Sequence, residues 1–307
     1  MKELAASIDI GSHTARLLIA QRSESSPWGW APLARRRAYI RLAADFGLEG
    51  EGGIGPDATA RVLDVLRDFC RLIAEYRVTQ VHAVATGVIR NAVHGDRFLS
   101  RLYEGTGLPI ELISGEKEAF LSGRGACAAL NIHGDALVFD LGGGTTEFLR
   151  NMGGEIKGVS LSLGAAVLTK RFIGSDPPGA GDLDALSREV EHRLKPVASD
   201  IRGVPLLVGT GGSVATLAAL VHGIAMDDIR PDRINGLKVT LSQLEACLAK
   251  MKILTTAERV ARLRLDSGRA DVIVAGSLAI IGILRFLEKV DLVASMSDLL
   301  EGLLIDI

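Results

Sequence analysis

The sequence predicts an α/β protein made of two related domains that face each other across a cleft. Its 307 residues suit two domains of the usual size of about 100 to 200 residues. A strand, a glycine turn and a second strand occur twice in the same order, and strand-length apolar runs alternate with helical segments elsewhere. Hydrophobic residues make up 48% of the chain and charged residues 23%, which excludes general disorder.

The repeated hairpin is the strongest organisational signal. Residues 6–14 read ASIDIGSHT, and residues 138–146 read VFDLGGGTT. In each copy an apolar strand ends in an aspartate, Asp9 or Asp140, a glycine-containing turn follows, and an apolar run returns. Glycine accepts positive φ and lets backbone N–H groups approach a ligand without a Cβ in the way. The sequence therefore predicts two hairpins whose turns face the same cleft.

The other elements follow in alternating order. The periodicity predicts helices over 57–75, 96–104 and 116–129, with a buried strand at 81–85. After the second hairpin it predicts a strand at 155–161, a helix at 183–194, a strand and helix at 206–208 and 214–221, and an apolar central helix at 272–284. A boundary within 126–134 divides the chain into domains of residues 1–128 and 129–307.

Charge and hydropathy limit the partners and the location. The formal net charge of -2 gives no general attraction to a polyanion, so no nucleic-acid partner is expected and a phosphate site must use local charge. Lys2 and Glu3 lead directly into a strand pattern and not into a signal-peptide core, which indicates a cytoplasmic protein. The apolar stretch 204–226 is broken by glycines, so it reads as strand, loop and helix and not as a membrane span. The oligomeric state stays open, a homodimer included.

The two aspartates that end the repeated strands are candidate metal ligands. Asp9 and Asp140 offer hard oxygen atoms, which match Mg²⁺, with Mn²⁺ as an alternative. The structural alternative is that an aspartate before glycine only makes a turn.

A third glycine loop is a candidate phosphate site. Residues 209–213 read GTGGS and lead from an apolar strand into a helix, so Gly211 and Gly212 would present backbone N–H groups at the positive end of the helix dipole. The alternative is a plain helix cap made by Ser213.

Two glutamates are candidates for proton transfer. Glu118 lies in the acidic first turn of the helix at 116–129, and Glu147 follows the glycines of the second hairpin. Close carboxylates raise one pKa, and a carboxylate beside a water molecule can accept its proton. The alternative for Glu118 is a favourable interaction with the helix dipole and nothing more.

Several short blocks of sequence follow one another along the chain. They are Ile8-Asp9-Ile10-Gly11-Ser12 with Arg16, Ala85-Thr86 with Arg90, Ile113-Ser114-Gly115 with Glu118-Ala119, residues 140–147 (DLGGGTTE), residues 160–172, residues 209–213, Arg269-Ala270-Asp271 with Gly276, and Glu301-Gly302. In this order the sequence resembles the exopolyphosphatase and guanosine pentaphosphate phosphatase family. The resemblance extends over nearly the whole chain, and the combination of blocks is more specific than any one of them.

The resemblance implies an actin-like fold of two ribonuclease-H-like domains and a magnesium-dependent attack of water on a terminal phosphoryl group. The substrate would be inorganic polyphosphate or guanosine pentaphosphate, and a final helix at about 297–306 would pack back on the first domain. By matching position, Glu118 resembles the catalytic base, Glu147 a second acid that holds water or metal, and Asp140 and Asp9 the metal-linked acids. The implied substrate-binding residues are Ser12, His13, Arg90, Gly143, Gly144, Thr145, Gly211, Gly212 and Ser213.

Some positions depart from the family pattern and keep other functions open. His13 replaces a common asparagine, and Val167 and Leu300 stand where the family usually has arginine. Phosphoryl transfer depends on positioning and charge stabilisation, so the two missing charges bear on turnover and substrate choice. The alternatives are an actin-like kinase that uses ATP on a small molecule, and a non-catalytic phosphate or nucleotide sensor.

Overall fold

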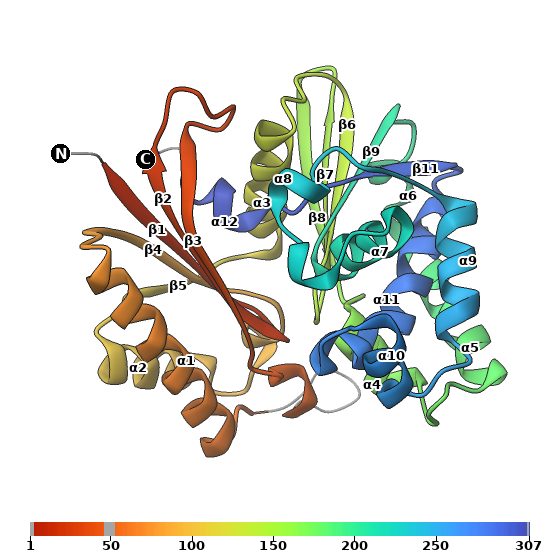
Figure 1. Cartoon of the computed structure of the whole chain (residues 1–307), viewed down its shortest axis with the longest axis horizontal. Helices are drawn as coiled ribbons and strands as arrows, with labels where there is room; N and C mark the ends of the chain where they lie inside the picture. The colour runs from red at the N-terminus through yellow and green to blue at the C-terminus, as the bar shows by residue number, and fades with distance from the viewer. Residues whose placement is uncertain (1–2, 46–52, 306) are drawn as a thin grey trace.

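The chain folds around two mixed β-sheets that lie side by side (Figure 1). The computed structural model describes residues 3–45, 53–305 and 307. The first sheet contains β1 (Leu4–Ile10), β2 (Thr14–Arg22), β3 (Trp30–Tyr39), β4 (Gln80–Ala85) and β5 (Ile110–Leu112), in the order β3-β2-β1-β4-β5. The second sheet contains β6 (Ala136–Leu141), β7 (Thr146–Met152), β8 (Glu155–Leu161), β9 (Leu206–Thr210), β10 (Lys238–Thr240) and β11 (Asp291–Ala294), in the order β10-β11-β9-β6-β7-β8.

The predicted duplication is present in the sheet topology. β1 pairs with β2 antiparallel and with β4 parallel, and β6 pairs with β7 antiparallel and with β9 parallel. The register is also equivalent, because Asp9 lies opposite Arg16 and Asp140 lies opposite Glu147. Directly opposite residues of an antiparallel pair share one face of the sheet. Each hairpin therefore presents a pair of polar side chains on one face of its sheet, at the equivalent register position.

Helices α1 and α2 cover the outer face of the first sheet (Figure 1). The helical elements of this half are η1 (Leu42–Asp45), α1 (Pro56–Glu75), η2 (Gly87–Asn91), α2 (Gly95–Thr106) and α3 (Gly115–Ala129). In α1 the buried side chains Val62, Leu66, Phe69 and Ile73 recur every three or four residues, which is the spacing of one helix face. This face packs on strand residues such as Ile8 and forms the first core.

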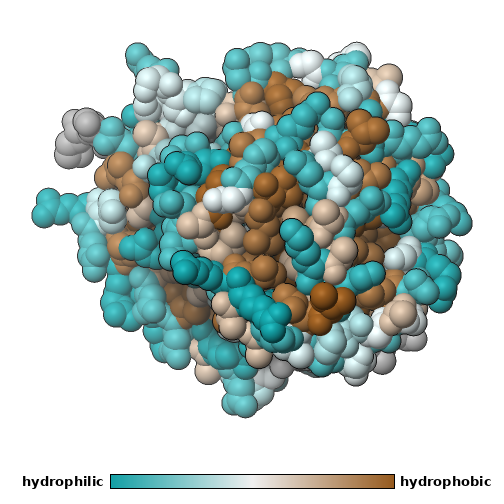
Figure 2. Space-filling model, turned by 45° about the vertical axis from the view of Figure 1, so that its right-hand side comes forward, coloured by the Kyte–Doolittle hydropathy of each residue, from teal (hydrophilic) through white to brown (hydrophobic). Residues whose placement is uncertain are grey.

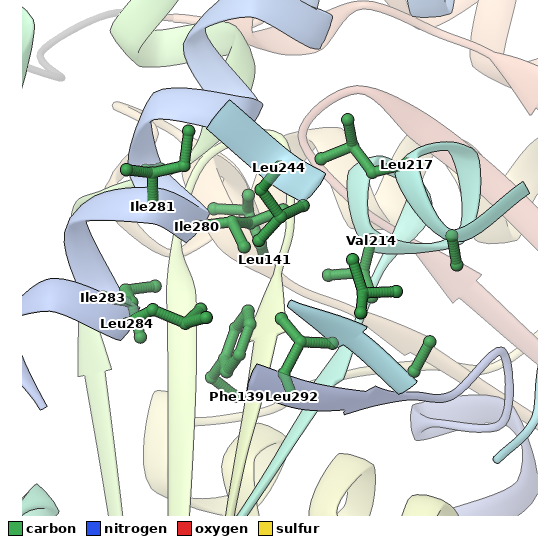
Figure 3. Packing of buried hydrophobic residues seen from close by; sticks show 14 of the residues in the cluster. Phe139, Leu141, Val214, Leu217, Leu244, Ile280, Ile281, Ile283, Leu284 and Leu292 are labelled. Atoms are coloured by element: carbon green, nitrogen blue, oxygen red, sulfur yellow. The ribbon is translucent and has the colours of Figure 1, made fainter. Parts of the chain in front are cut away.

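The second core lies between its sheet and the long helix α11. The helical elements of this half are α4 (Ala165–Phe172), α5 (Ala180–Leu194), η3 (Lys195–Val197), α6 (Ala198–Ile201), α7 (Gly212–His222), η4 (Met226–Asp228), α8 (Pro231–Ile234), α9 (Leu241–Met251), α10 (Thr256–Leu263), α11 (Ser267–Phe286) and α12 (Leu299–Gly302). Figure 3 shows Leu141 of β6 close to Ile280 of α11, and Phe139 of β6 close to Leu284 of the same helix. On the surface of this half, apolar side chains appear in strips between polar ones (Figure 2).

Among the described residues, α11 is the one helix whose length and apolar composition would allow a membrane span. In this structure 78% of its most apolar window is buried inside the protein. The burial explains its composition, because a helix surrounded by core needs no polar face.

Helices α3 and α12 lie between the two sheets (Figure 1). α3 packs against β6, β7 and β8, and α12 packs against α3, β1 and β2. The C-terminal segment thus packs on the first sheet, as the family resemblance implied. The expected helix over about 297–306 is wrong in length, since α12 covers Leu299–Gly302 only and residue 306 lies outside the described residues.

Candidate active site

A cavity of about 410 Å³ lies where the two hairpin turns meet. Both turns close with the same bond, since the Gly11 N–H donates to the Thr14 carbonyl at 2.9 Å and the Gly142 N–H to the Thr145 carbonyl at 3.0 Å. The predicted residues that line the cavity are Asp9, Ser12, His13, Glu118, Asp140, Gly143, Gly144, Thr145, Glu147, Gly211 and Gly212. The prediction that the two turns face one cleft is therefore correct.

The two turns touch each other directly across the cleft. A Cβ on Gly143 would lie 2.4 Å from the Cβ of His13, and a Cβ on Gly144 would lie 2.2 Å from the Ser12 hydroxyl. The same hydroxyl accepts a hydrogen bond from the Val88 N–H at 2.9 Å. These glycines are needed for close approach of the domains as well as for any approach of a ligand.

The second hairpin and α3 bring three carboxylates to one side of the cavity. Asp140 and Glu147 are opposite partners on β6 and β7, on the face that α3 covers, and Glu118 lies in the first turn of α3. Arg90 pairs with Glu118 and places its other Nη atom 3.6 Å from Glu147. Ser160 donates to Glu147 at 2.7 Å. Three buried carboxylates this close together need compensating groups, which Arg90 and Ser160 provide here.

Burial raises the pKa of three acids of the cavity, Asp140, Glu147 and Glu118. Burial raises the pKa of Asp140 to about 7, with further increases from the charges of Asp298 and Glu118 and a decrease from Arg16. Burial also raises the pKa of Glu147, and neighbouring Glu118 and Asp140 add to the effect. For Glu118, burial raises the pKa and the Arg90 charge lowers it. These carboxylates are thus poised to take up a proton or a cation.

The first hairpin contributes a cation where the second contributes an acid. Arg16 occupies the register position equivalent to that of Glu147, and its Nε and Nη2 donate to one Asp9 oxygen at 3.0 and 2.8 Å. Thr86 donates to the other Asp9 oxygen at 3.1 Å. Arg16 also pairs with Asp298, which precedes α12 and lines the cavity.

The third glycine loop meets a buried arginine. Gly211, at φ +98°, precedes α7, and a Cβ on Gly212 would lie 1.8 Å from an Arg269 nitrogen, so the guanidinium rests on the loop. Arg269 is only 7% exposed and burial lowers its pKa. Its Nη1 donates to Ser213 at 3.3 Å, and its Nε has no hydrogen-bond partner among the described residues. Arg269 of α11 thus places a buried cation beside the glycine loop at the N-terminus of α7.

Two of the predicted substrate-binding residues do not line the cavity. Arg90 lies behind Glu118, and Ser213 is fully buried against Gly276 of α11. Arg16 and Asp298 carry no predicted role, although Arg16 belongs to the first of the family-like blocks and Asp298 lies just before the last. Their signal in the sequence is a charged residue inside an apolar segment, which becomes informative only once its partner is known.

The donor chemistry of the site fits Mg²⁺ held partly by the protein. Among residues 3–45, 53–305 and 307, no three His, Cys, Asp or Glu side chains form a complete metal cage. Mg²⁺ is commonly held by one or two carboxylates together with substrate phosphates and water. Asp140 and Glu147 could supply two such oxygen ligands on one face, and Asp140 has no ion-pair partner among the described residues. Asp9 fits less well, since Arg16 and Thr86 already use its oxygens.

The two positions where the family usually has arginine are apolar contacts with the first domain. Val167 of α4 packs against the first core, and Leu300 of α12 packs against β1 and β2 residues. Near Leu300 the positive charge comes instead from the first domain, where Arg35 pairs with Glu301 and Arg16 with Asp298.

Comparisons with known proteins agree with this architecture. Residues 18–307 match the model of the Ppx/GppA phosphatase family. The chain is 32% identical to exopolyphosphatase 2 of Mycobacterium tuberculosis over 97% of this chain and 96% of that protein. A crystal structure of the Aquifex aeolicus Ppx/GppA family member superposes with a TM-score of 0.82 at 30% identity, covering 100% of this chain and 97% of that one. An exopolyphosphatase from Cytophaga hutchinsonii has a TM-score of 0.88 at 24% identity over 99% and 98% of the chains, which shows the shared fold. The predicted actin-like α/β fold with two domains is confirmed.

Proposed function

The chain belongs to the Ppx/GppA phosphatase family and is a hydrolase of phosphoanhydride bonds, and from that premise we propose that it removes the terminal phosphate of a polyphosphate chain or of guanosine pentaphosphate. The observation that supports this most is the meeting of both hairpin turns and the third glycine loop at one cavity that also contains buried carboxylates. Glycine loops suit phosphate oxygens, and a carboxylate suits the attacking water.

The proposed reaction divides its tasks among named residues. Backbone N–H groups of the turns and the Arg269 guanidinium bind phosphate oxygens. Glu118 takes a proton from water as the water oxygen bonds to the terminal phosphorus. The bridging P–O bond breaks, and the shortened chain leaves with the negative charge. Burial raises the pKa of Glu118, which makes it a stronger base than an exposed glutamate.

A divalent cation would complete the charge balance of this site. We assign Asp140 and Glu147 as the residues that hold Mg²⁺ or Mn²⁺. When bound, the cation would neutralise phosphate charge and offset the crowding of carboxylates. Asp9 then has the separate task of orienting Arg16.

The lining of the cavity bears on the choice between the two substrates. Beyond the glycine loops one part of the wall is apolar, formed by Met226, Ile229, Pro231, Leu265 and Met296. Another part is charged, formed by Arg35, Arg36, Arg37, Arg230 and Asp266. An inorganic chain has no surface to cover the apolar side chains, whereas a nucleoside does. The apolar part favours guanosine pentaphosphate, whereas the four arginines of the lining and the relative from Mycobacterium tuberculosis, named exopolyphosphatase 2, support polyphosphate.

Phosphate release from a panel of substrates tests the proposal. The panel contains short and long polyphosphate, guanosine pentaphosphate, and ATP with small acid and sugar acceptors, each with Mg²⁺, with Mn²⁺ and with chelator. We expect release with either metal and loss of release with chelator. Phosphate transfer to an acceptor would identify the kinase alternative, and binding without release would identify the sensor.

A further inference from the structure

Arg16 is held from two sides at the edge of the cavity. Its Nε and Nη2 donate to Asp9 at 3.0 and 2.8 Å, and its Nη1 donates to Asp298. These bonds use three of the five guanidinium N–H groups, so two remain for another acceptor. The acids are almost fully buried, with side-chain exposures of 6% and 2%, whereas the Arg16 side chain is 23% exposed and lines the cavity.

Asp298 reaches this place because the C-terminal segment is fixed against both domains. It begins a capping box on α12, in which its own N–H donates to the Glu301 carboxylate at 2.9 Å. A Cβ on Gly125 of α3 would lie 2.0 Å from the Asp298 carbonyl oxygen, so the two helices touch through backbone. The Ser7 hydroxyl of β1 donates to the Leu300 carbonyl at 2.8 Å. Asp298 is thus held at a defined position relative to both hairpins.

We infer that Asp298 is a positioning residue for phosphoryl transfer, which together with Asp9 fixes the Arg16 guanidinium so that its free N–H groups point to the reacting phosphate. The inference rests on the proposed function. A fixed cation stabilises the charge that develops in the transition state more than a mobile one, because it needs no reorganisation when the charge appears. Burial would lower the pKa of Arg16, but the charges of Asp298 and Asp9 raise it well above its ordinary value, so the side chain stays cationic.

Steady-state kinetics on four variants test this role. The variants are Asp298→Asn, Arg16→Gln, their double mutant, and Glu301→Gln. Loss of one fixed donor costs about 10²–10³ in rate, so we expect that loss of kcat for Arg16→Gln and about 10-fold for Asp298→Asn, with KM within about 3-fold. If Asp298 acts through Arg16, the double mutant should be no slower than Arg16→Gln within about 3-fold.

Glu301→Gln is the matched control. Glu301 is fully buried in the same capping box but pairs with Arg35 instead of Arg16. We expect it to lower the thermal midpoint as Asp298→Asn does, because the ion pair with Arg35 is lost. The kcat should stay within about 2-fold, because the amide oxygen can still accept the hydrogen bond from the Asp298 N–H and the segment still presents Asp298. An equal loss of kcat in Glu301→Gln would overturn the inference, as would wild-type kcat in Asp298→Asn or multiplied losses in the double mutant.

A further variant covers the case in which Asp298→Asn does not fold. Arg16→Lys keeps the charge balance but cannot present forked donors between two carboxylates. We expect its kcat to fall at least about 10-fold, and wild-type kcat would overturn the inference. The wild-type protein separates a failure of the proposed function from a failure of the positioning role. If the wild type releases phosphate from no substrate, the proposed function is rejected. If the wild type releases phosphate and these substitutions leave the rate unchanged, only the positioning role is rejected.

Discussion

Glu118 shares the first turn of α3 with a second acid, and the two differ in burial. Glu116 is exposed, and Glu118 is buried beside Arg90. The dipole of the helix favours each charge by about 0.3 to 1 kcal/mol, so a loss of stability cannot by itself separate a general base from a capping acid. Substitution of each glutamate in turn therefore compares a buried acid of the cavity with an exposed acid of the same helical turn.

The first prediction uses this pair. Glu118→Gln should lower kcat by about 10²–10⁴ with substrate affinity within a few-fold, because the amide keeps the shape but cannot accept a proton. Glu116→Gln should lose only the dipole contribution and keep its rate. Phosphate release and thermal midpoint are measured on the same preparations. Wild-type turnover in Glu118→Gln would reject the proposed base.

Glu147→Gln provides a second comparison for the same measurement. If Glu147 holds the cation together with Asp140, its substitution should raise the Mg²⁺ concentration needed for half-maximal rate as well as slow turnover. Glu118→Gln should leave that concentration nearly unchanged. Identical Mg²⁺ curves for the two variants would show that the assigned roles are not distinct.

The second prediction concerns pH and follows from Asp140. Burial raises its pKa from 3.8 to about 7 in the folded protein, so the folded state holds this proton more tightly than the unfolded state does. The stability that protonation of Asp140 provides is therefore complete below about pH 4 and lost as the pH rises through 7. The raised pKa values of Glu118 and Glu147 act in the same direction.

Thermal unfolding in chelator should accordingly show a lower midpoint at pH 8 than at pH 5. Mg²⁺ should recover part of the difference at pH 8, because it replaces the lost positive charge. Asp140→Asn removes the titrating group and should flatten the dependence. A midpoint in Asp140→Asn that falls with pH as steeply as in the wild type would contradict the assignment.

At the scale of elements, the hairpins could be predicted because their signals are local. An aspartate, a glycine turn and alternating apolar residues are enough to define two paired strands, and both appear where expected. The contact between the turns could not be predicted, because nothing local in Gly143 or Gly144 specifies that His13 and Ser12 would fill the space above them. A contact between two distant segments of the chain leaves no periodic pattern in the sequence from which it could be predicted.

Strand β3 shows a different reason for a missed element. Its residues Arg35, Arg36 and Arg37 form an unbroken run of cations, which hides the alternation expected of a strand. The run is tolerated because β3 is an edge strand of the sheet, and Arg35 and Arg37 find acidic partners in distant segments, Glu301 and Asp266.

The third prediction concerns the contact between the turns. Gly143→Val places a branched side chain where a Cβ already lies 2.4 Å from that of His13, so the turns must separate. We expect a loss of stability of about 1–3 kcal/mol and at least a 10-fold loss of substrate affinity. The control is Gly134→Val, since a Cβ at Gly134 meets no atom within 4 Å. If the Gly143→Val protein is less stable but binds substrate with unchanged affinity, the role of this glycine is in packing and not in substrate binding.

In the whole molecule, the C-terminal segment connects the two domains, because α12 packs both on α3 and on the first sheet. Leu300 and Leu304 complete a small core with Leu18 and Trp30 on the face of the first sheet opposite α1. The Trp30 indole donates to the Leu304 carbonyl at 2.8 Å. The first domain therefore depends on residues at the far end of the chain. Sequence order alone gives no sign of this, and the expectation that a final helix packs on the first domain came from the family resemblance.

The last prediction tests this dependence with Leu304→Ala. Leu304 is fully buried, so its truncation should cost about 2–5 kcal/mol, and the cost should fall on the first domain. The chain has two tryptophans, Trp28 and Trp30, and both contribute to or pack on this small core, so tryptophan fluorescence reports the first domain while circular dichroism reports the whole chain. In the wild type we expect the two probes to melt together, and in Leu304→Ala the fluorescence transition should move to lower temperature. Leu284→Ala, an equally buried change in the second core, should not advance fluorescence relative to dichroism. If the two probes stay coincident in Leu304→Ala, the segment stabilises both domains as one cooperative unit, and the first domain has no separate dependence on it.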